Sequence, residues 1–420
     1  MQWLTPVFVV AVVAEAITRL WLSSRQIAAV RAHRDTVPEQ FRGQVELADQ
    51  QKAADYTVAR ARLGRLDTVA DAVVRLAFTL GGGIALIESL WSRAHLSQPW
   101  HGALVIGTTL LALMVINLPF SLWSTFRVEV RFGFNRMTPA LYVLDLAKSL
   151  LLGVILGGPL VVGAIALMDR GGRWWWLYAW LGWTAFSLAL TWAFPRFIAP
   201  LFNKFSPVSD DALKARVEGL LERCGFHSKG VFVMDGSRRS AHGNAYFTGV
   251  GRNKRIVFFD TLLERLAIGE VEAVLAHELG HFRLKHVRQR LMLSLVLSLG
   301  AFAFIAWLAV QPGFYTALGV PEPSSHAALL LAMMVAPAFT YFITPIGAWW
   351  SRRHEFQADD FAAKHADARE LADALVKLYR SNASTLTPDR IHSAFYDSHP
   401  PARVRIARLN ALSGAASAAH

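Results

Sequence analysis

Long apolar stretches, separated by polar segments, dominate the pattern of hydrophobic and polar positions along the chain. Each is close to the roughly 20 residues that a helix needs to cross the hydrocarbon core of a bilayer. They cover residues 3–22, 69–91, 103–123, 144–168, 174–194, 291–310 and 327–349. The pattern therefore predicts a polytopic, mainly α-helical membrane protein with about seven transmembrane helices.

Polar segments separate these stretches into two groups. Residues 1–194 hold the first five predicted transmembrane helices with their loops, and residues 291–349 hold the last two. Residues 195–290 and 350–420 lack long apolar stretches, so we expect both to fold outside the bilayer. The chain is thus predicted to contain two membrane segments, each followed by a polar segment.

The distribution of Lys and Arg predicts how the helices are oriented, because cytoplasmic loops are enriched in both residues. The segment after the first apolar stretch carries Arg25, Arg31, Arg34, Arg42, Lys52, Arg60, Arg62 and Arg65, whereas residues 313–326 carry neither. With seven spans, these two segments fall on opposite sides. We therefore expect the N-terminus outside, and the C-terminus and both polar segments in the cytoplasm.

Composition supports a membrane protein and excludes other classes. Hydrophobic residues make up 54% of the 420 residues and charged residues 18%, which is too apolar for an ordinary soluble enzyme of this size. The net charge of +12 would suit nucleic acid, but no basic motif interleaved with aromatic residues is present, so we expect no nucleic-acid partner. The single cysteine, Cys224, excludes an intrachain disulfide framework and a multi-cysteine metal site.

The sequence AHELGHFRLKH places candidate metal ligands just before the sixth apolar stretch. His277 and His281 are four residues apart and share one face of a predicted helix. Both imidazoles can bind one zinc ion there, and Glu278 is placed to activate a water molecule at the metal. His286 is nine residues from His277, so a continuous helix would turn it to the opposite face. A motif this short also arises by chance on polar helices.

A catalytic zinc site needs a third protein ligand and an open position. The sequence SRRHEFQADDFAAKHA, after the last apolar stretch, offers Glu355. Asp359 lies one turn further along the same predicted helix, where a carboxylate can hydrogen-bond to a ligating histidine. Taken alone, this acidic pair suits a solvated helix face, but with HExxH it completes a His₂Glu set. His354 and His365 are rival ligands.

An ordered set of motifs extends over most of the chain: RFGFNRMT, FPRFIAPLFNKFSPV, GNAYFTG, AVLAHELGHF, SRRHEFQAD and YDSHPPARVRI. Together they resemble the type I CAAX prenyl endopeptidase family, which consists of integral-membrane zinc metallopeptidases of the gluzincin kind. The resemblance implies a bacterial-type member, located as a multi-pass protein in the inner cell membrane.

The resemblance also implies the architecture of the site. Seven helices would enclose a large intramembrane chamber, capped by a zincin-like α+β catalytic portion on the cytoplasmic side. One Zn²⁺ per chain would be bound by His277, His281 and Glu355. Glu278 would act as the general base, and Asp359 would support a ligating histidine.

Two further motifs gain expected roles from this resemblance. GNAYFTGVG followed by KRIVFFD predicts two short strands joined by a glycine-containing turn, and Asn244 and Ala245 resemble family positions that contact the substrate backbone. In SHPPARVRI, the resemblance gives His399 the role of a donor to the developing oxyanion. Arg405 matches a family arginine expected near the substrate. Val404 stands where an acidic residue is expected, which leaves Arg405 without a predicted partner.

Three functions remain open at this point. The favoured one is a membrane-embedded zinc endopeptidase that cleaves near the C-terminus of prenylated, CAAX-type peptides in a lipid bilayer. The second is a quality-control protease that degrades damaged membrane proteins. The third is a transporter or channel with structural zinc, suggested by the charged pairs in the predicted spans, Glu15 with Arg19, Asp71 with Arg75, and Asp145 with Lys148.

Overall fold

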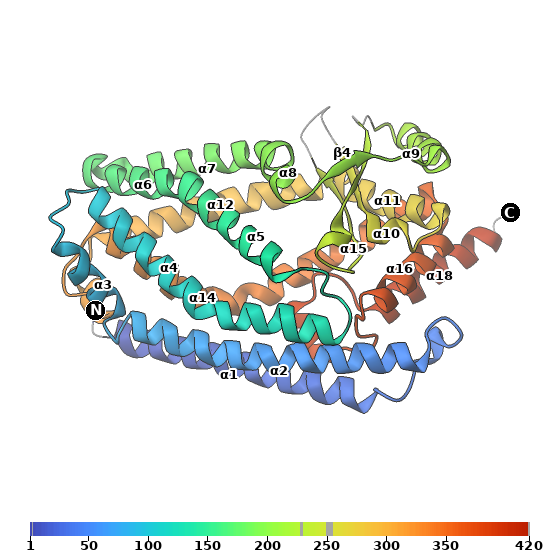
Figure 1. The fold of residues 1–420 in the computed structure, drawn as a ribbon, viewed down its shortest axis with the longest axis horizontal. Coiled ribbons are helices and arrows are strands. Elements are labelled where there is room, and N and C mark those ends of the chain that lie inside the picture. Colours follow the sequence, from blue (N-terminus) through green and yellow to red (C-terminus); the bar gives the residue numbers. More distant parts are fainter. Residues whose placement is uncertain (2, 227–229, 249–254, 419–420) are drawn as a thin grey trace.

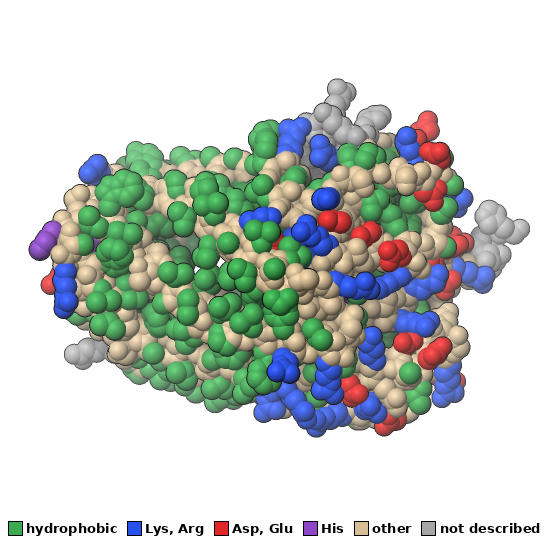
Figure 2. All heavy atoms as spheres, viewed as in Figure 1, with side chains coloured by type: hydrophobic (Ala, Val, Ile, Leu, Met, Phe, Trp, Pro, Cys, Tyr) green, Lys and Arg blue, Asp and Glu red, His purple; other side chains and the backbone are tan. Residues whose placement is uncertain are grey.

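The structure, a computed structural model, describes residues 1, 3–226, 230–248 and 255–418. Long helices make up one end of the elongated molecule, and a small sheet surrounded by shorter helices makes up the other (Figure 1). Apolar side chains cover the helical end, whereas charged side chains gather at the end that carries the sheet (Figure 2). The separation of apolar and charged surface is what a protein anchored in a bilayer by one end requires.

The long helices correspond to the predicted spans. They are α1 (Leu4–Ala32), α2 (Leu47–Phe78), α3 (Gly83–Ser92), α4 (Trp100–Trp123), α5 (Pro139–Leu152), α6 (Gly158–Arg170), α7 (Trp175–Ala193), α12 (His286–Ala309), α14 (Ser325–Thr340) and α15 (Thr344–His365). Among the described residues, six helical segments are long and apolar enough to cross a membrane, and α2 with α3 can supply a seventh. In that count, α5 continues into α6, and α14 into α15.

The second span differs from its prediction. The sequence predicts one helix over residues 69–91, but the chain bends by 50° between α2 and α3. Gly82 has a φ of +78°, a left-handed conformation that glycine adopts without strain. At Gly81, a Cβ atom would lie 2.6 Å from the carbonyl oxygen of Ala77. The second predicted span is therefore bent, because two glycines let the chain turn inside it.

Few residues of three membrane spans are fully buried. The most apolar window is only 6% buried in the α5–α6 span, 6% buried in the α7 span and 0% buried in α12. A helix in a closed bundle turns one side to lipid and the other to its neighbours. Little of the apolar surface of these spans is therefore covered by other parts of the protein.

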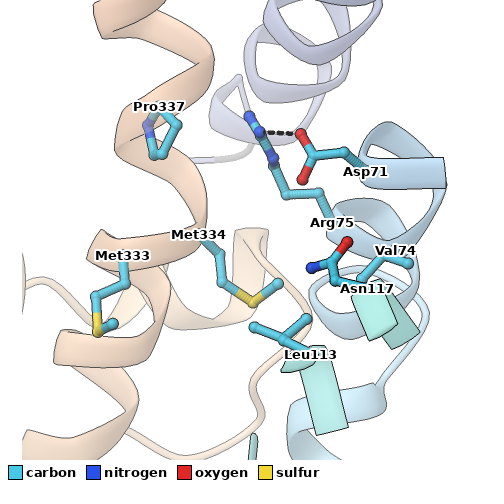
Figure 3. A pocket seen from close by; sticks show the side chains of 8 residues that line it. All are labelled: Asp71, Val74, Arg75, Leu113, Asn117, Met333, Met334 and Pro337. Atoms are coloured by element: carbon cyan, nitrogen blue, oxygen red, sulfur yellow. Dashed lines mark hydrogen bonds and ion pairs between the residues drawn. The ribbon is translucent and has the colours of Figure 1, made fainter. Parts of the chain in front are cut away.

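The wall opposite these helices carries polar groups at membrane depth. A cavity of about 160 Å³ lies between α2, α4 and α14 and is lined by Asp71, Val74, Arg75, Leu113, Asn117, Met333, Met334 and Pro337 (Figure 3). Arg75 pairs with Asp71 and, 2.8 Å away, with Glu15 of α1. Charged groups inside a membrane face the bundle interior and pair with each other. These ion pairs also connect α1 to α2.

The polar end contains a four-stranded sheet in the order β1-β2-β4-β3. Its strands are β1 (Phe205–Pro207), β2 (Val231–Met234), β3 (Ala245–Thr248) and β4 (Arg255–Phe259). β2 and β4 are parallel, and the outer strands are antiparallel to their neighbours. Pairing of Ala245 with Phe258 confirms the two predicted strands; the expected turn between them lies outside the described residues.

Helices from both polar segments pack around this sheet: α9 (Asp211–Arg223), α10 (Asp260–Leu263), α11 (Ile268–Arg283), α16 (Ala368–Ser381), α17 (Arg390–Tyr396) and α18 (Ala402–Ala418). One hydrophobic core joins them and includes Leu213, Phe258, Leu275, Leu375 and Leu409. The two polar segments, separated in sequence by α12, the short helix α13 (Pro312–Ala317) and α14, thus form a single folded unit.

Candidate active site

The HExxH motif lies in the last turns of α11. Glu270 fixes the start of this helix by accepting a hydrogen bond of 2.7 Å from the backbone N–H of Ala267. Ala276 and Leu279 are buried in the core and hold the helix against the sheet. His277 and His281 lie on the side of α11 that packs against α15, so the residue spacing places both imidazoles where the helix meets its neighbour.

α11 and α15 approach each other closely at Gly280. A Cβ atom on this glycine would lie 3.0 Å from the Cα atom of Ala358 and 3.1 Å from the Cβ atom of Phe361. Ala358 is fully buried and also small. The two small residues therefore allow the helices to come near enough for side chains on α15 to reach the two histidines on α11.

The three predicted ligands form a compact triangle of residues, in which each histidine is paired with a different oxygen of Glu355. His277 Nε2 lies 3.3 Å from His281 Nε2 and 3.4 Å from Glu355 Oε2, while His281 Nε2 lies 3.3 Å from Glu355 Oε1. A tetrahedral zinc ion with bonds of about 2.0–2.1 Å places its ligand atoms about 3.3–3.4 Å apart. The spacing of these atoms therefore suits a single zinc ion with a fourth position left open.

The orientation of His277 is set by its second ring nitrogen. Its Nδ1 lies 2.8 Å from Asp359 Oδ1, so an N–H at Nδ1 donates to the carboxylate and leaves Nε2 free for a metal. Burial and the Arg405 guanidinium both lower the pKa of His277, but hydrogen bonds to Asp359 and Glu355 outweigh them and raise it. A metal ion displaces that proton, so metal binding here is coupled to proton release.

Arg405 has a partner that the sequence did not reveal. Its Nε and one terminal nitrogen donate to the two oxygens of Asp359 at 2.8 and 2.7 Å, and the guanidinium is buried. The same terminal nitrogen lies 3.0 Å from His277 Nδ1. α18 is thereby tied to the two helices that carry the candidate ligands. The predicted contact of Arg405 with substrate stays a prediction.

The structure corrects the position of His286. The expectation that it points away from His277 assumed one continuous helix, but Lys285 has a φ of +63° and separates α11 from α12. The break brings His286 Nδ1 within 3.0 Å of His281 Nδ1, and His286 Nε2 within 2.9 Å of Gln357 Oε1. His286 can thus accept the Nδ1–H of His281 and donate to Gln357, which leaves His281 Nε2 facing the candidate metal position.

Glu278 has the surroundings expected of a proton acceptor. Its side chain is half-buried, and it makes no hydrogen bond or ion pair with any other residue that the structure describes. Glu355, by contrast, is engaged with both histidines of the motif. The two glutamates at the site therefore differ in their partners, and only Glu278 has a carboxylate free to take a proton from water.

His399 approaches the ligand set from a third direction. Its Nδ1 lies 2.6 Å from Glu355 Oε2, and 60% of its side chain is exposed. Arg352 of α15 helps to place it by donating to the backbone oxygen of Asp397 at 2.7 Å. The structure therefore brings His399 to the site, with one ring nitrogen near Glu355 and the ring open to solvent. Its role as an oxyanion donor stays a prediction.

α17, which precedes the His399 segment, is anchored to α1. Asp389 caps α17 by accepting from the backbone N–H of His392 at 2.9 Å. The same carboxylate pairs with Arg25 at 2.9 Å, and Gln26 accepts from the backbone N–H of Asp389 at 2.8 Å. A helix of the bilayer segment thus fixes the polar segment that carries His399.

Asn244 and Ala245 lie at the start of β3, an outer strand of the sheet. The backbone oxygen of Asn244 accepts from Phe259 at 3.0 Å, and Ala245 packs against the same hydrophobic core as α11. β3 pairs with β4 along one edge only, within the described residues. Its other edge is the kind of surface that binds an extended peptide. Contact of these two residues with substrate stays a prediction.

The rival ligands lie elsewhere. The ring of His354 stacks on that of His286, with centroids 3.9 Å apart and planes 3° apart. His365 Nδ1 lies 2.9 Å from the backbone oxygen of Phe361. Neither belongs to the group of donor atoms formed by the two motif histidines and Glu355.

Comparison with known proteins agrees with this architecture. Residues 26–204 match the family model described as CAAX prenyl protease N-terminal, five membrane helices, and residues 207–413 match the model of peptidase family M48. A CAAX prenyl protease 1 homolog of Arabidopsis thaliana is 37% identical over 71% of this chain and 70% of that protein. One from Caenorhabditis elegans is 31% identical over 94% of this chain and 95% of that protein.

A solved structure shows the same fold. The crystal structure of S. mikatae Ste24p superimposes with a TM-score of 0.89 at 28% identity, covering 96% of this chain and 98% of that one. The mainly helical membrane fold and the metalloprotease class expected from the sequence are therefore confirmed. The chain belongs to the membrane-embedded CAAX prenyl proteases of peptidase family M48.

Proposed function

We propose that this protein is a zinc endopeptidase that cleaves peptide bonds near the C-terminus of prenylated, CAAX-type substrates held in a lipid bilayer. The observation that carries the proposal is the triangle of residues formed by His277, His281 and Glu355, in which paired nitrogen and oxygen atoms lie 3.3–3.4 Å apart. The relatives named CAAX prenyl proteases supply the substrate class.

The chemistry follows from the residues around this triangle. When bound, a zinc ion lowers the pKa of a water molecule at its open position and polarises the scissile carbonyl. Glu278, with its free carboxylate, takes the proton from the attacking water and later delivers it to the leaving amine. His399 donates a hydrogen bond to the oxyanion that develops on the oxygen of the scissile carbonyl.

The substrate backbone has a place beside these groups. An extended peptide added to the open edge of β3 would hydrogen-bond through its main chain near Asn244 and Ala245. Such bonds are tolerant of sequence, so selectivity for a prenylated peptide must come from elsewhere. Burying a prenyl chain between the helices favours binding by about 0.8 kcal/mol per CH₂. The entropy lost when the chain is immobilised reduces this gain.

The proposed orientation puts the site in the cytoplasm. Arg25 and Arg34 belong to the basic segment after the first apolar stretch, and Arg25 pairs with Asp389 at the polar end of the molecule. Basic segments stay on the cytoplasmic side, so the polar end that contacts this segment should lie there too. Location in a bacterial inner membrane stays a prediction.

The decisive test compares a farnesylated CAAX peptide with its unprenylated twin. We expect the purified full-length protein in detergent to cleave the farnesylated peptide preferentially, and a zinc chelator to abolish cleavage until zinc is returned. Glu278→Gln protein, purified in parallel, controls for contaminating proteases. Equal cleavage of both peptides would contradict the proposed substrate class and favour a quality-control protease. The relatives named above are CAAX prenyl proteases, which gives a transporter with structural zinc no support.

A further inference from the structure

A second group of metal-binding side chains lies at the end of the molecule far from the active site. Glu88 belongs to α3, His101 to the first turn of α4, and His326 to the first turn of α14. These helix ends gather at the tip where the N-terminus lies, whereas α11 and α15 meet near the opposite end (Figure 1). None of the three residues takes part in the proposed peptidase site.

The three side chains offer donor atoms at short range. Glu88 Oε1 lies 2.7 Å from His101 Nε2, and Glu88 Oε2 lies 2.7 Å from His326 Nε2. The three donor atoms, one from each residue, lie within 4.8 Å of one another. Both histidines are buried, with exposed fractions of 8% and 2%, and Glu88 is partly exposed. Two buried imidazoles thus face one carboxylate that solvent can reach.

The surrounding residues are fitted to His326. A Cβ atom on Gly102 would lie 2.8 Å from both Cβ and Nδ1 of His326, so only glycine leaves room for this ring. Ser324 caps α14 by accepting from Ala327 at 3.2 Å, and its hydroxyl lies 3.1 Å from His326 Nε2. Gln98 lies 3.4 Å from His326 Nδ1. The atom of Gln98 at this distance is its amide nitrogen, a donor, so the contact favours the tautomer of His326 with its proton at Nε2, which a metal ion bound there would displace.

We propose that Glu88, His101 and His326 form a second metal site, which binds a divalent transition-metal ion of the zinc type. Two imidazole nitrogens and one carboxylate oxygen are the donor set of a His₂Glu zinc site. The nitrogen–oxygen separations of 2.7 Å are those of hydrogen bonds from two neutral imidazoles to Glu88. To admit zinc, the atoms must separate to about 3.3 Å. Glu88, being partly exposed, can move by that amount while the helices stay in place.

The ion would connect three helices and so stabilise their packing at this tip. α14 comes from a part of the sequence far from the consecutive helices α3 and α4, and the bend between α2 and α3 leaves α3 as a short, separate helix. A ligand that binds the folded state alone raises its stability with concentration. The second ion should therefore raise the melting temperature without entering the peptidase reaction.

The test counts zinc in the full-length protein purified in detergent, loaded with Zn²⁺ and dialysed. Because the active site can bind zinc too, the count is made with and without His281→Ala. We expect close to two zinc ions per wild-type chain, one in His281→Ala, one in His326→Gln, and none in the double variant. His326→Gln should retain the peptidase activity of the wild type. Added Zn²⁺ should raise the melting temperature of His281→Ala and leave that of the double variant unchanged.

Two controls keep the result interpretable. His95→Asn removes an exposed imidazole from the same tip at a residue with a φ of +49°, a conformation that Asn tolerates; its zinc count should equal that of wild type. Glu88→Gln keeps the size of the side chain and an accepting oxygen but removes the charge. Its zinc count should equal that of His326→Gln. This variant tests the proposal even if the histidine variant fails to fold. One zinc ion per wild-type chain, or an unchanged count in folded Glu88→Gln, would overturn the proposal irrespective of peptidase activity.

Discussion

Each candidate zinc ligand is held by a group that fixes which of its atoms faces the metal position. Asp359 lies at Nδ1 of His277, and His286 lies at Nδ1 of His281. His399 lies beside Glu355 Oε2. Supporting groups of this kind typically change metal affinity or activity by 10–100-fold when removed. The site is therefore built from pairs of residues, and loss of a partner should weaken it even when the ligand remains.

Glu278→Gln should separate metal binding from chemistry. Glutamine keeps the size of glutamate but cannot accept the water proton at neutral pH, so we expect peptidase activity to fall to near background. The variant should retain zinc, since Glu278 is not part of the donor triangle. Zinc analysis and peptide cleavage on the same preparation measure both quantities. Substantial activity in the zinc-loaded variant would remove Glu278 from its role as base.

His399→Ala distinguishes two roles for this histidine. A donor to the oxyanion acts mainly in the transition state, so its loss should lower kcat by about 10²–10³-fold with little effect on KM. A residue that only orients Glu355 should instead lower zinc affinity, and excess zinc should restore kcat. We expect the first pattern, because the ring is 60% exposed and open to substrate. Steady-state kinetics at saturating and limiting zinc decide between them.

Residue spacing groups the candidate ligands and Asp359, but it does not reveal the other contacts around them. His277 and His281 share a helical face by spacing alone, and Glu355 with Asp359 repeats that spacing. The contact of Arg405 with Asp359 joins α18 to α15. The two residues are far apart in the sequence, so no local sequence pattern predicts that they pair. His286 was misplaced because the left-handed residue that separates α11 from α12 is Lys285, and lysine carries no turn signal of the kind that Gly or Asn gives.

At the scale of helices, the separation of α11 from α15 controls the site. All three candidate ligands come from these two helices, and a side chain at Gly280 would meet the backbone of Ala358 at 3.0–3.2 Å. Buried interfaces respond to added volume by shifting, because they are already close-packed. A change in this spacing therefore alters the donor triangle itself.

Gly280→Val should impair the site without touching a ligand. The added methyl groups force α11 away from α15, and misplacement by about 1 Å can lower activity on the order of 10²-fold. We expect weaker zinc binding and lower kcat. Gly300→Val is the matched control, because Gly300 lies in α12 with open space around its Cα. Equal activity in the two variants would show that helix spacing does not limit the site.

The elements themselves were largely predictable, with exceptions that have physical causes. Apolar length identifies the spans, and two short runs of strand-forming residues beside a glycine-containing turn identify β3 and β4. Hydropathy does not predict the bend between α2 and α3, because Gly81 and Gly82 lie within a continuous apolar stretch. The order of strands β1-β2-β4-β3 depends on which edges meet in space, a contact that residue spacing does not encode.

At the scale of the whole molecule, the charged end and the apolar end dictate orientation. Charged side chains gather around the sheet, and the opposite tip lies beyond the apolar surface (Figure 2). A reporter fused after His420 should therefore show cytoplasmic activity, and one inserted near Gly313 should show external activity. Accessibility to a membrane-impermeant label gives an independent measurement. The reverse pattern would overturn the proposed orientation, while leaving the metal site intact.

The continuous helical stretch from Ser325 to His365 sets a fixed height for the chemistry. Glu355 follows Ser325 by 30 residues, which is about 45 Å of helix, against about 30 Å for the hydrocarbon core. With Ser325 at the outer boundary and the helix parallel to the membrane normal, Glu355 lies about 15 Å beyond the inner boundary. An extended chain spans that gap only with about five residues. A bond cut close to its lipid anchor therefore demands that the anchor leave the bilayer and follow the peptide into the protein.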